Sequence, residues 1–459
     1  MERFHTDVLI AGLGPVGAVL AALLAQRGVS VIACDRELEI YRLPRAAHFD
    51  AEIMRVFQQL GLADEMLRNS RNIDAYEFVN AKGEMLMRFA VPQATSQGWP
   101  ASFMFHQPAL EEALRRKLAR EGQVEMLPGT ALVSFAQDAD GVSAVLAGGR
   151  TVRARYLVGC DGGNSLVRKA LDVPLFDYGF DEPWLVVDTR MPDEAHLKPY
   201  GLQVCDPTRP TTIMPMSPGR RRWEFMLLPD ETPEEMLQEE RVGALMQPWT
   251  SPGTEIVRKA VYRFHGLVAT RWRDGRVLLA GDAAHQMPPF AGQGMCSGIR
   301  DAANLAWKLE LVLKGEASER LLDTYQEERE PHVRRIVETA IAMGKVVCTL
   351  DPEAAAARDR EMIAARAGAA ADPHAPVGAG LAAGFLHPSP RAGEMAPQSA
   401  ARDEVDGHGF RLIAADSCDD AMRAWLGETE AAMVRPDKYV FGTGAKAELK
   451  AALARALTA

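Results

Sequence analysis

The sequence predicts an α/β fold with three parts: a parallel sheet covered by helices, an inserted antiparallel sheet and a short C-terminal unit. A strand, a tight turn, a helix and a second strand follow one another within residues 7–35. Short β-branched and aromatic runs, separated by prolines, fill residues 176–264. Residues 351–400 are rich in alanine, glycine and proline, which indicates a helix followed by a linker. At 459 residues the chain exceeds one typical core, so two or three domains are expected.

The first element is the segment 7–35. "DVLIAG" is a short apolar run that ends in glycine, which is typical of a buried strand. "AVLAALLAQRG" is rich in alanine and leucine and ends at Gly28, a favoured residue just after a helix. "VSVIACD" is β-branched and ends at Asp35. A strand–helix–strand unit of this kind places its two strands side by side in a parallel sheet.

The following elements alternate between helices and strands. Apolar periodicity predicts one helix over residues 54–67 and another over 105–120. "TVRARYLVGCDGG" and "GRVLLAGDAA" are predicted strands that end in glycine and aspartate. Residues 297–349 are predicted to be helical. The inserted antiparallel sheet is expected to contain the runs "PWLVVDTRM", "GLQVCD", "TTIMPM", "RRWEFMLLP" and "KAVYRFHGLVA", with "VPQATSQGWP" close to it.

These elements predict a division into discontinuous domains. The parallel-sheet domain is expected in three parts, residues 1–75, 103–178 and 269–350. The inserted domain is expected to combine residues 76–102 and 179–268. A helix and linker over 351–400 and a small C-terminal unit over 401–459 complete the chain.

Composition excludes several classes of function. The net charge of -10 disfavours nucleic acid, whose binding depends on neutralising phosphates with lysine and arginine. No apolar run approaches the roughly 20 residues of a membrane span. The six cysteines form no Cys-x-x-Cys pair and the ten histidines form no ligand cluster, so no metal site is expected. With no signal peptide, free thiols indicate a reducing compartment, the cytoplasm.

The turn between the first strand and helix carries the first functional motif. Gly12, Gly14 and Gly17 form a G-x-G-x-x-G pattern with Pro15 inside it, and Asp35 ends the next strand. In a dinucleotide-binding turn the first glycine allows the tight bend, the second admits a pyrophosphate, and the third lets the helix pack on the sheet. Asp35 then accepts hydrogen bonds from an adenosine ribose, with Arg36 beside it. The alternative is an ordinary strand–helix turn.

Two further loops follow predicted strands. The first contains Asp161, Gly162 and Gly163, and the second contains Gly281 and Asp282. Ligands of open α/β sheets bind beyond the carboxyl ends of the strands. Three such loops in one chain therefore predict one extended ligand.

Together these motifs carry a resemblance to a known family. The glycine turn, the Asp-Gly pair at 161–162 and the Gly-Asp pair at 281–282 resemble, in order and spacing, the single-component FAD-dependent aromatic monooxygenases of the p-hydroxybenzoate hydroxylase superfamily. The resemblance covers about residues 5–345. Within the family, "YRLPRAAHFDAE", "CDGGNSLVR", "CDPTRP", "RRWEFMLLP", "GDAAHQMPPFAGQG" and "LLDTYQEERE" resemble the 3-(3-hydroxyphenyl)propionate hydroxylase branch. The tail is shorter than the thioredoxin-like domain of many members, which suggests an abbreviated version of it.

The resemblance implies a Rossmann-type FAD-binding domain and a specific chemistry. NADH or NADPH as co-substrate reduces FAD, and O2 then forms a C4a-hydroperoxyflavin that hydroxylates a phenol. The implied partner is a small aromatic substrate, with a homodimer as a possible assembly. The implied substrate is a monocyclic phenol like 3-(3-hydroxyphenyl)propionate. A larger phenol (a biphenyl, a nitrophenol or a polyketide) and a non-hydroxylating FAD oxidoreductase remain alternatives.

The resemblance also assigns cofactor residues. Asp282 is expected to hold the ribityl hydroxyls of the flavin. The helix start at Gly294, Met295 and Cys296 is expected to direct backbone N–H groups at the N1–C2=O edge, where reduced flavin is negative. His285 is expected to be structural. Arg45 is expected near the flavin and its phosphates, and Gln107 at the ribityl chain. Asp161 is expected to brace the dinucleotide loop, and Arg168 to contact the pyrophosphate or the nicotinamide donor.

Other residues are candidates for the catalytic base and for the substrate contacts. His48 is the candidate base for the phenol, because the pKa of a histidine suits proton removal near neutral pH. The alternative is a histidine packed in the wall of the cleft. Arg209 or Arg222 is a candidate clamp for a substrate carboxylate. Tyr262 and Pro289 complete the candidate substrate contacts, with His265 as a further polar group.

Overall fold

The computed structural model describes residues 4–40, 46–368, 380–398 and 408–459. Its first sheet has the strand order β17-β18-β11-β1-β2-β8. The strands are β1 Thr6–Ala11, β2 Val31–Cys34, β8 Val124–Leu127, β11 Thr151–Gly159, β17 Arg273–Asp274 and β18 Val277–Leu279. All neighbours pair in parallel except β17 and β18. Helix α1, Pro15–Ala25, connects β1 to β2, so the predicted parallel strand–helix–strand unit is confirmed.

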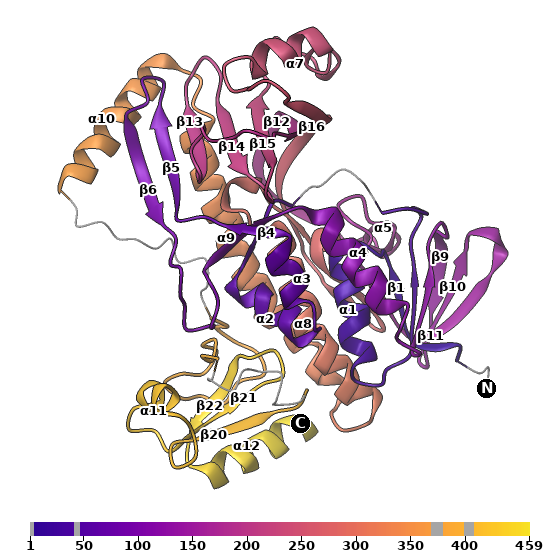
Figure 1. Cartoon of the computed structure of the whole chain (residues 1–459). Coiled ribbons are helices and arrows are strands. Elements are labelled where there is room, and N and C mark those ends of the chain that lie inside the picture. Colours follow the sequence, from indigo (N-terminus) through magenta and orange to yellow (C-terminus); the bar gives the residue numbers. More distant parts are fainter. Residues whose placement is uncertain (1–3, 41–45, 369–379, 399–407) are drawn as a thin grey trace.

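One face of this sheet is covered by three helices that pack together. Helix α1 lies between α4, Gln107–Leu118, and α8, Gly294–Leu313 (Figure 1). A hairpin of β9, Leu132–Gln137, and β10, Val142–Leu146, adds an antiparallel extension along the first half of β11. This hairpin was not predicted from the sequence.

The prediction of a single helix over residues 54–67 is wrong. Two helices occupy this stretch, α2 Ala51–Gln59 and α3 Ala63–Arg68. Gly61 separates them with a φ of 72°, a left-handed conformation that ends a helix and that glycine adopts without steric cost. The apolar period continues across the break, which is why the pattern indicated one helix.

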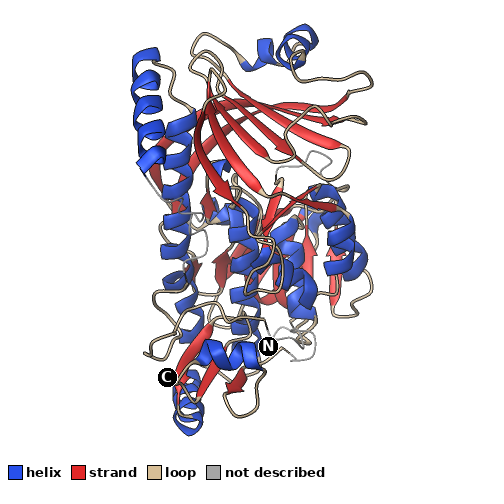
Figure 2. Ribbon diagram, turned by 60° about the vertical axis from the view of Figure 1, so that its left-hand side comes forward, coloured by secondary structure: helices blue, strands red, loops and turns tan. Residues whose placement is uncertain are grey.

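The second sheet is large and curved, with the strand order β19-β16-β12-β15-β14-β13-β5-β6 (Figure 2). Its strands are β5 Ala75–Asn80, β6 Met85–Ala90, β12 Leu175–Arg190, β13 Gly201–Cys205, β14 Thr211–Pro215, β15 Arg220–Met226, β16 Glu255–Ala269 and β19 His285–Gln286. The runs expected to be antiparallel strands are all present. The exception to antiparallel pairing is β13 with β5, which is parallel.

The two faces of the second sheet have different neighbours. The outer face packs in an apolar core with the short helices α6, Pro233–Met236, and α7, Glu239–Met246. Leu185, Trp223 and Phe225 belong to this core. Because side chains alternate along a strand, the residues between them point to the other face, toward the first sheet.

Two long helices and a small sheet join these parts. Helix α9, Thr324–Val347, contacts α8 and also β13 and β16, and α10, Pro352–Gly368, lies along β6 (Figures 1 and 2). The small sheet has the order β3-β7-β4, with bounds β3 His48–Asp50, β4 Ser70–Asn72 and β7 Ser102–Phe105. No described helix combines the length and the apolar character needed to cross a bilayer.

The C-terminal unit is a three-stranded antiparallel sheet with two helices. Its elements are β20 Arg411–Ala414, α11 Asp420–Leu426, β21 Ala431–Val434, β22 Val440–Gly444 and α12 Lys446–Thr458. A buried ion cluster attaches it to α8 and α9: Glu328 pairs with Arg435 at 2.6 Å and with Lys308 at 2.9 Å. Burial of charges this close requires such pairing, because an unpaired buried charge is strongly destabilising.

Candidate functional site

The three predicted loops meet because their strands end at the same level. The register pairs Ala11 at the end of β1 with Gly159 at the end of β11, and Gly159 with Leu279 at the end of β18. Ala11 also pairs with Cys34, the last residue of β2. The glycine turn, the Asp161 loop and the Asp282 loop therefore lie side by side at one edge of the sheet.

The glycines of the first turn have different surroundings. A Cβ at Gly12, where φ is 106°, would lie 2.3 Å from the carbonyl oxygen of Cys160. A Cβ at Gly17 would lie 2.0 Å from the carbonyl oxygen of Gly12. A Cβ at Gly14 would meet no protein atom within 4 Å. Gly12 and Gly17 are therefore required by the packing of the protein itself, whereas Gly14 keeps open space in front of the N-terminus of α1.

A cavity of about 1100 Å³ opens in front of this turn and extends to the inner face of the second sheet. The candidate residues that line it are Gly14, Pro15, Arg36, His48, Gln107, Asp161, Arg222, Tyr262, Asp282, Pro289, Gly294 and Met295. The described candidates that do not line it are Gly12, Gly17, Asp35, Cys296 and Arg209. Arg45 lies outside the described residues.

Asp35 braces the glycine turn from behind. One of its carboxylate oxygens accepts a hydrogen bond from the backbone N–H of Leu13 at 2.7 Å, and the other accepts from the N–H of Glu37 at 2.8 Å. Arg36 lines the cavity and pairs with Glu37 at 3.1 Å. This end of the cavity is therefore shaped chiefly by backbone and by short polar contacts.

The second loop is tied into the structure by Asp161 and Arg168. Asp161 accepts hydrogen bonds from the Ser165 hydroxyl at 2.5 Å and from the Val167 N–H at 3.1 Å. Arg168 donates to the carbonyls of Ala283 at 2.9 Å and Gly163 at 2.8 Å. It thus connects the second loop to the third and does not line the cavity, and its contact with a pyrophosphate or the nicotinamide donor stays a prediction.

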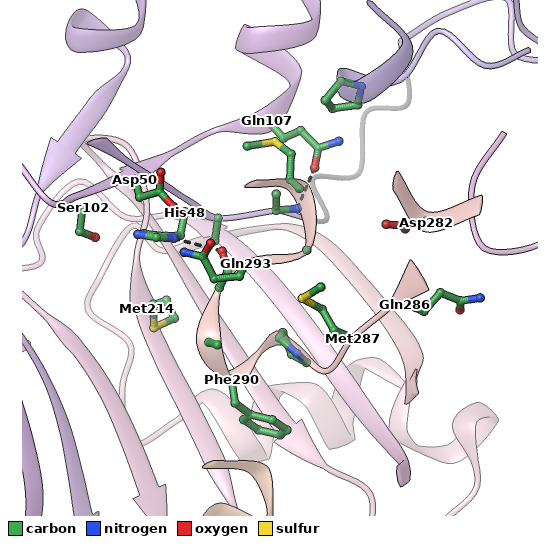
Figure 3. Close-up of a pocket in the computed structure, with 18 of the residues that line it drawn as sticks. His48, Asp50, Ser102, Gln107, Met214, Asp282, Gln286, Met287, Phe290 and Gln293 are labelled. Atoms are coloured by element: carbon green, nitrogen blue, oxygen red, sulfur yellow. Dashed lines mark hydrogen bonds between the residues drawn. The ribbon is translucent and has the colours of Figure 1, made fainter. Parts of the chain in front are cut away.

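In the third loop, Asp282 and His285 point to different places. Asp282 lies in a short 3-10 turn, Gly281–Ala283, and faces the cavity (Figure 3). His285 is buried, and its Nε2 lies 2.7 Å from Asp301, which also pairs with Arg329 at 2.9 Å. The buried contact of His285 ties the third loop to α8, and Asp301 in turn ties α8 to α9, in agreement with the structural role predicted for His285.

The start of α8 forms another wall. Gln293, Gly294 and Met295 line the cavity at the N-terminus of this long helix, where backbone N–H groups have no partner within the helix. Cys296 is buried behind them, with its sulfur 3.8 Å from the carbonyl oxygen of His48 and 3.9 Å from that of Gly292. Burial raises the pKa of the Cys296 thiol well above its usual range, so the thiol stays protonated and inert.

His48 lies between the loops and the second sheet. It begins β3, and its Nδ1 is 3.0 Å from the carbonyl oxygen of Gly292 (Figure 3). Because a carbonyl only accepts, Nδ1 carries the proton and Nε2 keeps its lone pair. Burial lowers the pKa of His48, and the nearby Asp50 carboxylate raises it in part. The imidazole is therefore neutral at neutral pH and able to accept a proton at Nε2.

Next to His48 is a charged group that the sequence analysis missed. Arg300 on α8 donates to Asp50 at 2.6 Å, to Glu52 at 2.6 Å and to Gln293 at 3.0 Å. Tyr439 of the C-terminal unit donates its hydroxyl to Glu52 at 2.9 Å. Asp50 and Glu52 stand in the "HFDAE" stretch, but nothing in its spacing indicates an arginine some 250 residues away.

The candidate substrate residues of the second sheet already make hydrogen bonds to other residues of the protein. Arg222 donates to both carboxylate oxygens of Asp188, at 2.7 and 3.1 Å. Tyr262 accepts a hydrogen bond from Arg258. Arg209 does not reach the cavity, because it makes a two-pronged pair with Glu231, each bond 2.6 Å long. The clamp proposed for Arg209 is thus not supported by its position.

Comparison with known proteins identifies the relatives of this architecture. A family model described as "FAD binding domain" matches residues 5–340. The chain is 40% identical to a probable NADH-specific resorcinol 4-hydroxylase of Rhodococcus jostii (strain RHA1), an alignment that covers 100% of this chain and 95% of the relative. It is also 40% identical to a 3-(3-hydroxy-phenyl)propionate/3-hydroxycinnamic acid hydroxylase of Comamonas testosteroni, with 79% of this chain aligned to 62% of the relative. The chain therefore spans less than two thirds of that second protein.

Solved structures agree on the fold. The crystal structure of the flavin-dependent monooxygenase PieE in complex with FAD and substrate matches with a TM-score of 0.83 at 23% identity, covering 98% of this chain and 99% of that one. A ternary complex of aklavinone-11 hydroxylase with FAD and aklavinone matches with a TM-score of 0.81 at 26% identity, covering 100% of both chains. The predicted α/β fold is confirmed.

Proposed function

The chain belongs to the FAD binding domain family, and on that premise we propose that it is an NADH-dependent flavin hydroxylase of a monocyclic phenol. One observation carries the proposal. A single cavity joins the glycine turn at α1 to the polar inner face of the second sheet, and His48 lies between them with Nε2 free to accept a proton. Cofactor space, substrate space and a base are thereby combined in one site. The name of the Rhodococcus jostii relative supports both NADH and a phenolic substrate.

The residues around the first half of the cavity fit FAD. The open space in front of Gly14 is what a pyrophosphate needs for close approach to the N-terminus of α1. In the proposal, Gly14 and Pro15 hold the pyrophosphate, and Arg36 holds the adenosine end while Asp35 braces the turn behind it. Gln107 and Asp282 hold the ribityl hydroxyls of the flavin, and Asp161 braces the second loop. Gly294 and Met295, at the start of α8, direct N–H groups and the positive end of the helix dipole at the flavin ring. When bound, FAD supplies the redox chemistry, because NADH reduces it and the reduced form activates O2.

His48 is the proposed base for the substrate phenol. Gly292 fixes the tautomer by accepting the Nδ1 proton, so Nε2 receives the proton from the phenol oxygen. Removal of this proton makes the ring electron-rich at the neighbouring carbon, where hydroxylation occurs. Asp50 then stabilises the imidazolium, and it is itself held by Arg300.

Apolar side chains keep water from this region. Met287, Phe290 and Phe264 line the cavity between the third loop and the second sheet. The rings of Phe264 and Phe290 meet edge to face with centroids 6.4 Å apart. Exclusion of water strengthens the interactions of the few polar groups that remain.

Two further predictions extend the proposal. The first is a cytoplasmic location, which is supported by the six described cysteines, all of them free thiols. A homodimer is also proposed, from the family resemblance alone.

The test is a substrate panel with the purified holoenzyme. We expect bound flavin in the visible spectrum, and NADH oxidation that accelerates when resorcinol or 3-(3-hydroxyphenyl)propionate is added. Product analysis must find a ring with one more hydroxyl. A protein that binds no FAD, or that oxidises NADH at one rate with every phenol including bulky polycyclic ones, refutes the proposal.

A further inference from the structure

The inner face of the second sheet carries two rows of polar residues across neighbouring strands. In the first row Gln203 on β13 pairs with Thr212 on β14, which pairs with Glu224 on β15. The polar members of the second row, one pleat away, are Arg222, Asp188 and Arg258, and Met214 lies beside Arg222. Trp223 and Phe225, on either side of Glu224, point to the outer core. Glu224 is therefore held on the inner face by the alternation of its strand.

Glu224 is a member of this surface whose carboxyl borders the cavity and makes an ion pair with Arg222 at 3.8 Å. The residue is 6% exposed. The guanidinium of Arg222 is 3.8 Å away, beyond hydrogen-bond distance, and donates to Asp188 instead. The hydroxyl of Thr212, directly opposite, donates to Gln203 at 2.6 Å. Because the carboxyl borders the cavity, a ligand hydroxyl that enters the cavity can form a hydrogen bond with it.

The described arginines around the cavity, in contrast, are hydrogen-bonded to carboxylates of the protein. Each described arginine that lines it has a carboxylate partner: Arg36 with Glu37, Arg222 with Asp188, Arg263 with Asp181, and Arg300 with Asp50 and Glu52. A substrate carboxylate placed beside Arg222 would have to share that arginine with Asp188 and would lie close to Glu224. Like charges at this separation inside a cavity are strongly unfavourable.

Resting on the function proposed above, we propose that Glu224 determines specificity by binding a second ring hydroxyl, so that the preferred substrate is an uncharged dihydroxybenzene and not a phenol with a carboxylate side chain. One hydroxyl of the ring then gives its proton to His48 and the other is hydrogen-bonded to Glu224. Burial raises the pKa of Glu224 to about 7, against the lowering effect of Arg222. The carboxyl thus accepts from the hydroxyl when ionised and donates to it when protonated.

The experiment compares three ligands in wild type and Glu224→Leu holoenzyme: resorcinol, phenol and 3-(3-hydroxyphenyl)propionate. Dissociation constants come from the change in flavin absorbance on binding, and kcat/KM comes from product formation. Glu224→Leu should lower kcat/KM for resorcinol by about 10- to 100-fold, the value of one hydrogen bond to a charged group. For phenol, which lacks the second hydroxyl, the change should stay within about threefold, since no such bond is lost. The Kd of 3-(3-hydroxyphenyl)propionate should tighten by about tenfold as the repulsion disappears.

Two variants guard against a purely structural effect. Glu224→Gln keeps an acceptor of the same shape and should retain resorcinol turnover within about tenfold of wild type. Glu77→Gln is the matched control, because Glu77 is a buried glutamate of the same sheet that is bonded by Tyr200 and Arg88 and does not line the cavity. It should leave the ratio of resorcinol to phenol turnover unchanged. Bound flavin and Tm verify that each variant is folded.

Three outcomes overturn the inference. In the first, Glu224→Leu lowers resorcinol and phenol turnover equally, so that Glu224 is merely structural. In the second, both folded Glu224 variants leave the ratio unchanged. In the third, wild type prefers 3-(3-hydroxyphenyl)propionate to resorcinol. Wild-type protein that responds to none of the three phenols is a different result, because it refutes the proposed function itself.

Discussion

The two ends of the cavity are built in opposite ways. The end at the first sheet is formed by backbone at the ends of three adjacent strands, with glycines where protein atoms leave no room for a Cβ. The end at the second sheet is formed by side chains from several strands, brought together by their register. In the function proposed above, the first end binds FAD and the second binds the substrate, and the two relatives are named for different substrates. The difference shows that backbone atoms form the end proposed for the constant ligand, whereas side chains form the end proposed for the ligand that varies.

The largest effect is expected for Gly12→Ala, at the backbone end. The new Cβ would collide with the carbonyl oxygen of Cys160 at 2.3 Å, and alanine is strained at a φ of 106°. We expect a destabilisation of about 2–6 kcal/mol and loss of bound flavin, measured by thermal unfolding and by visible absorbance after gel filtration. Gly28→Ala is the control, because φ there is 75° but no atom lies within 4 Å of the added Cβ. Equal Tm losses for the two variants would contradict the packing argument.

The next effect is expected for His48→Gln, between the two ends. Glutamine can keep a hydrogen bond to Gly292 but cannot take a proton, so hydroxylation should fall by about 10²- to 10⁴-fold in kcat. The Kd of FAD, measured by fluorescence titration, should change by less than about threefold, since the change lies outside the proposed pyrophosphate contacts. If the variant hydroxylates the substrate at the wild-type rate, His48 is part of the cleft wall and the base lies elsewhere.

Gly14→Ala sharpens the contrast with Gly12→Ala. No protein atom opposes the new Cβ, so the folded protein should keep its Tm. The methyl group instead enters the space proposed for the pyrophosphate, at a cost of about 1–3 kcal/mol, or roughly 5- to 150-fold in the Kd of FAD. Titration of the apoprotein with FAD measures this directly. A variant with unchanged FAD affinity would show that the pyrophosphate is bound elsewhere.

The smallest effect is the position of the acid limb of the pH profile. Burial lowers the pKa of His48 below its ordinary 6.5, so the neutral, proton-accepting form persists as the pH falls through that value. Protonation at still lower pH removes the base, and kcat/KM for hydroxylation should then decline with an apparent pKa below 6.5. Rates measured from pH 5 to 8, with bound flavin recorded at each pH, test this. An acid limb above 6.5 would indicate a histidine stabilised in its charged form.

The sequence alone could predict the cofactor end because its motifs are local. Each loop directly follows a strand, and the carboxyl ends of neighbouring parallel strands must meet at one edge of the sheet. Gly14, Asp161 and Asp282 were therefore identifiable from short patterns and a family resemblance. The helix break at Gly61 was not, because an apolar period can continue through a left-handed residue.

The substrate end could not be predicted because it depends on register and on competition between partners. Arg209 and Arg222 are equally plausible clamps in the sequence, but Glu231 occupies one and Asp188 the other. No sequence pattern indicated the contacts of Arg300, because its partners Asp50 and Glu52 are about 250 residues distant in the chain.

By itself, then, the sequence determined the fold class, the FAD family and the three loops that border the cavity, because period, glycine and strand-end residues act over a few positions. Only the tertiary structure decided which charged side chains are neutralised, which tautomer His48 adopts and why Glu224 is left facing the cavity. These depend on atoms from distant segments approaching within about 3 Å, the range over which hydrogen bonds form. A short stretch of sequence does not indicate which distant atoms approach it this closely.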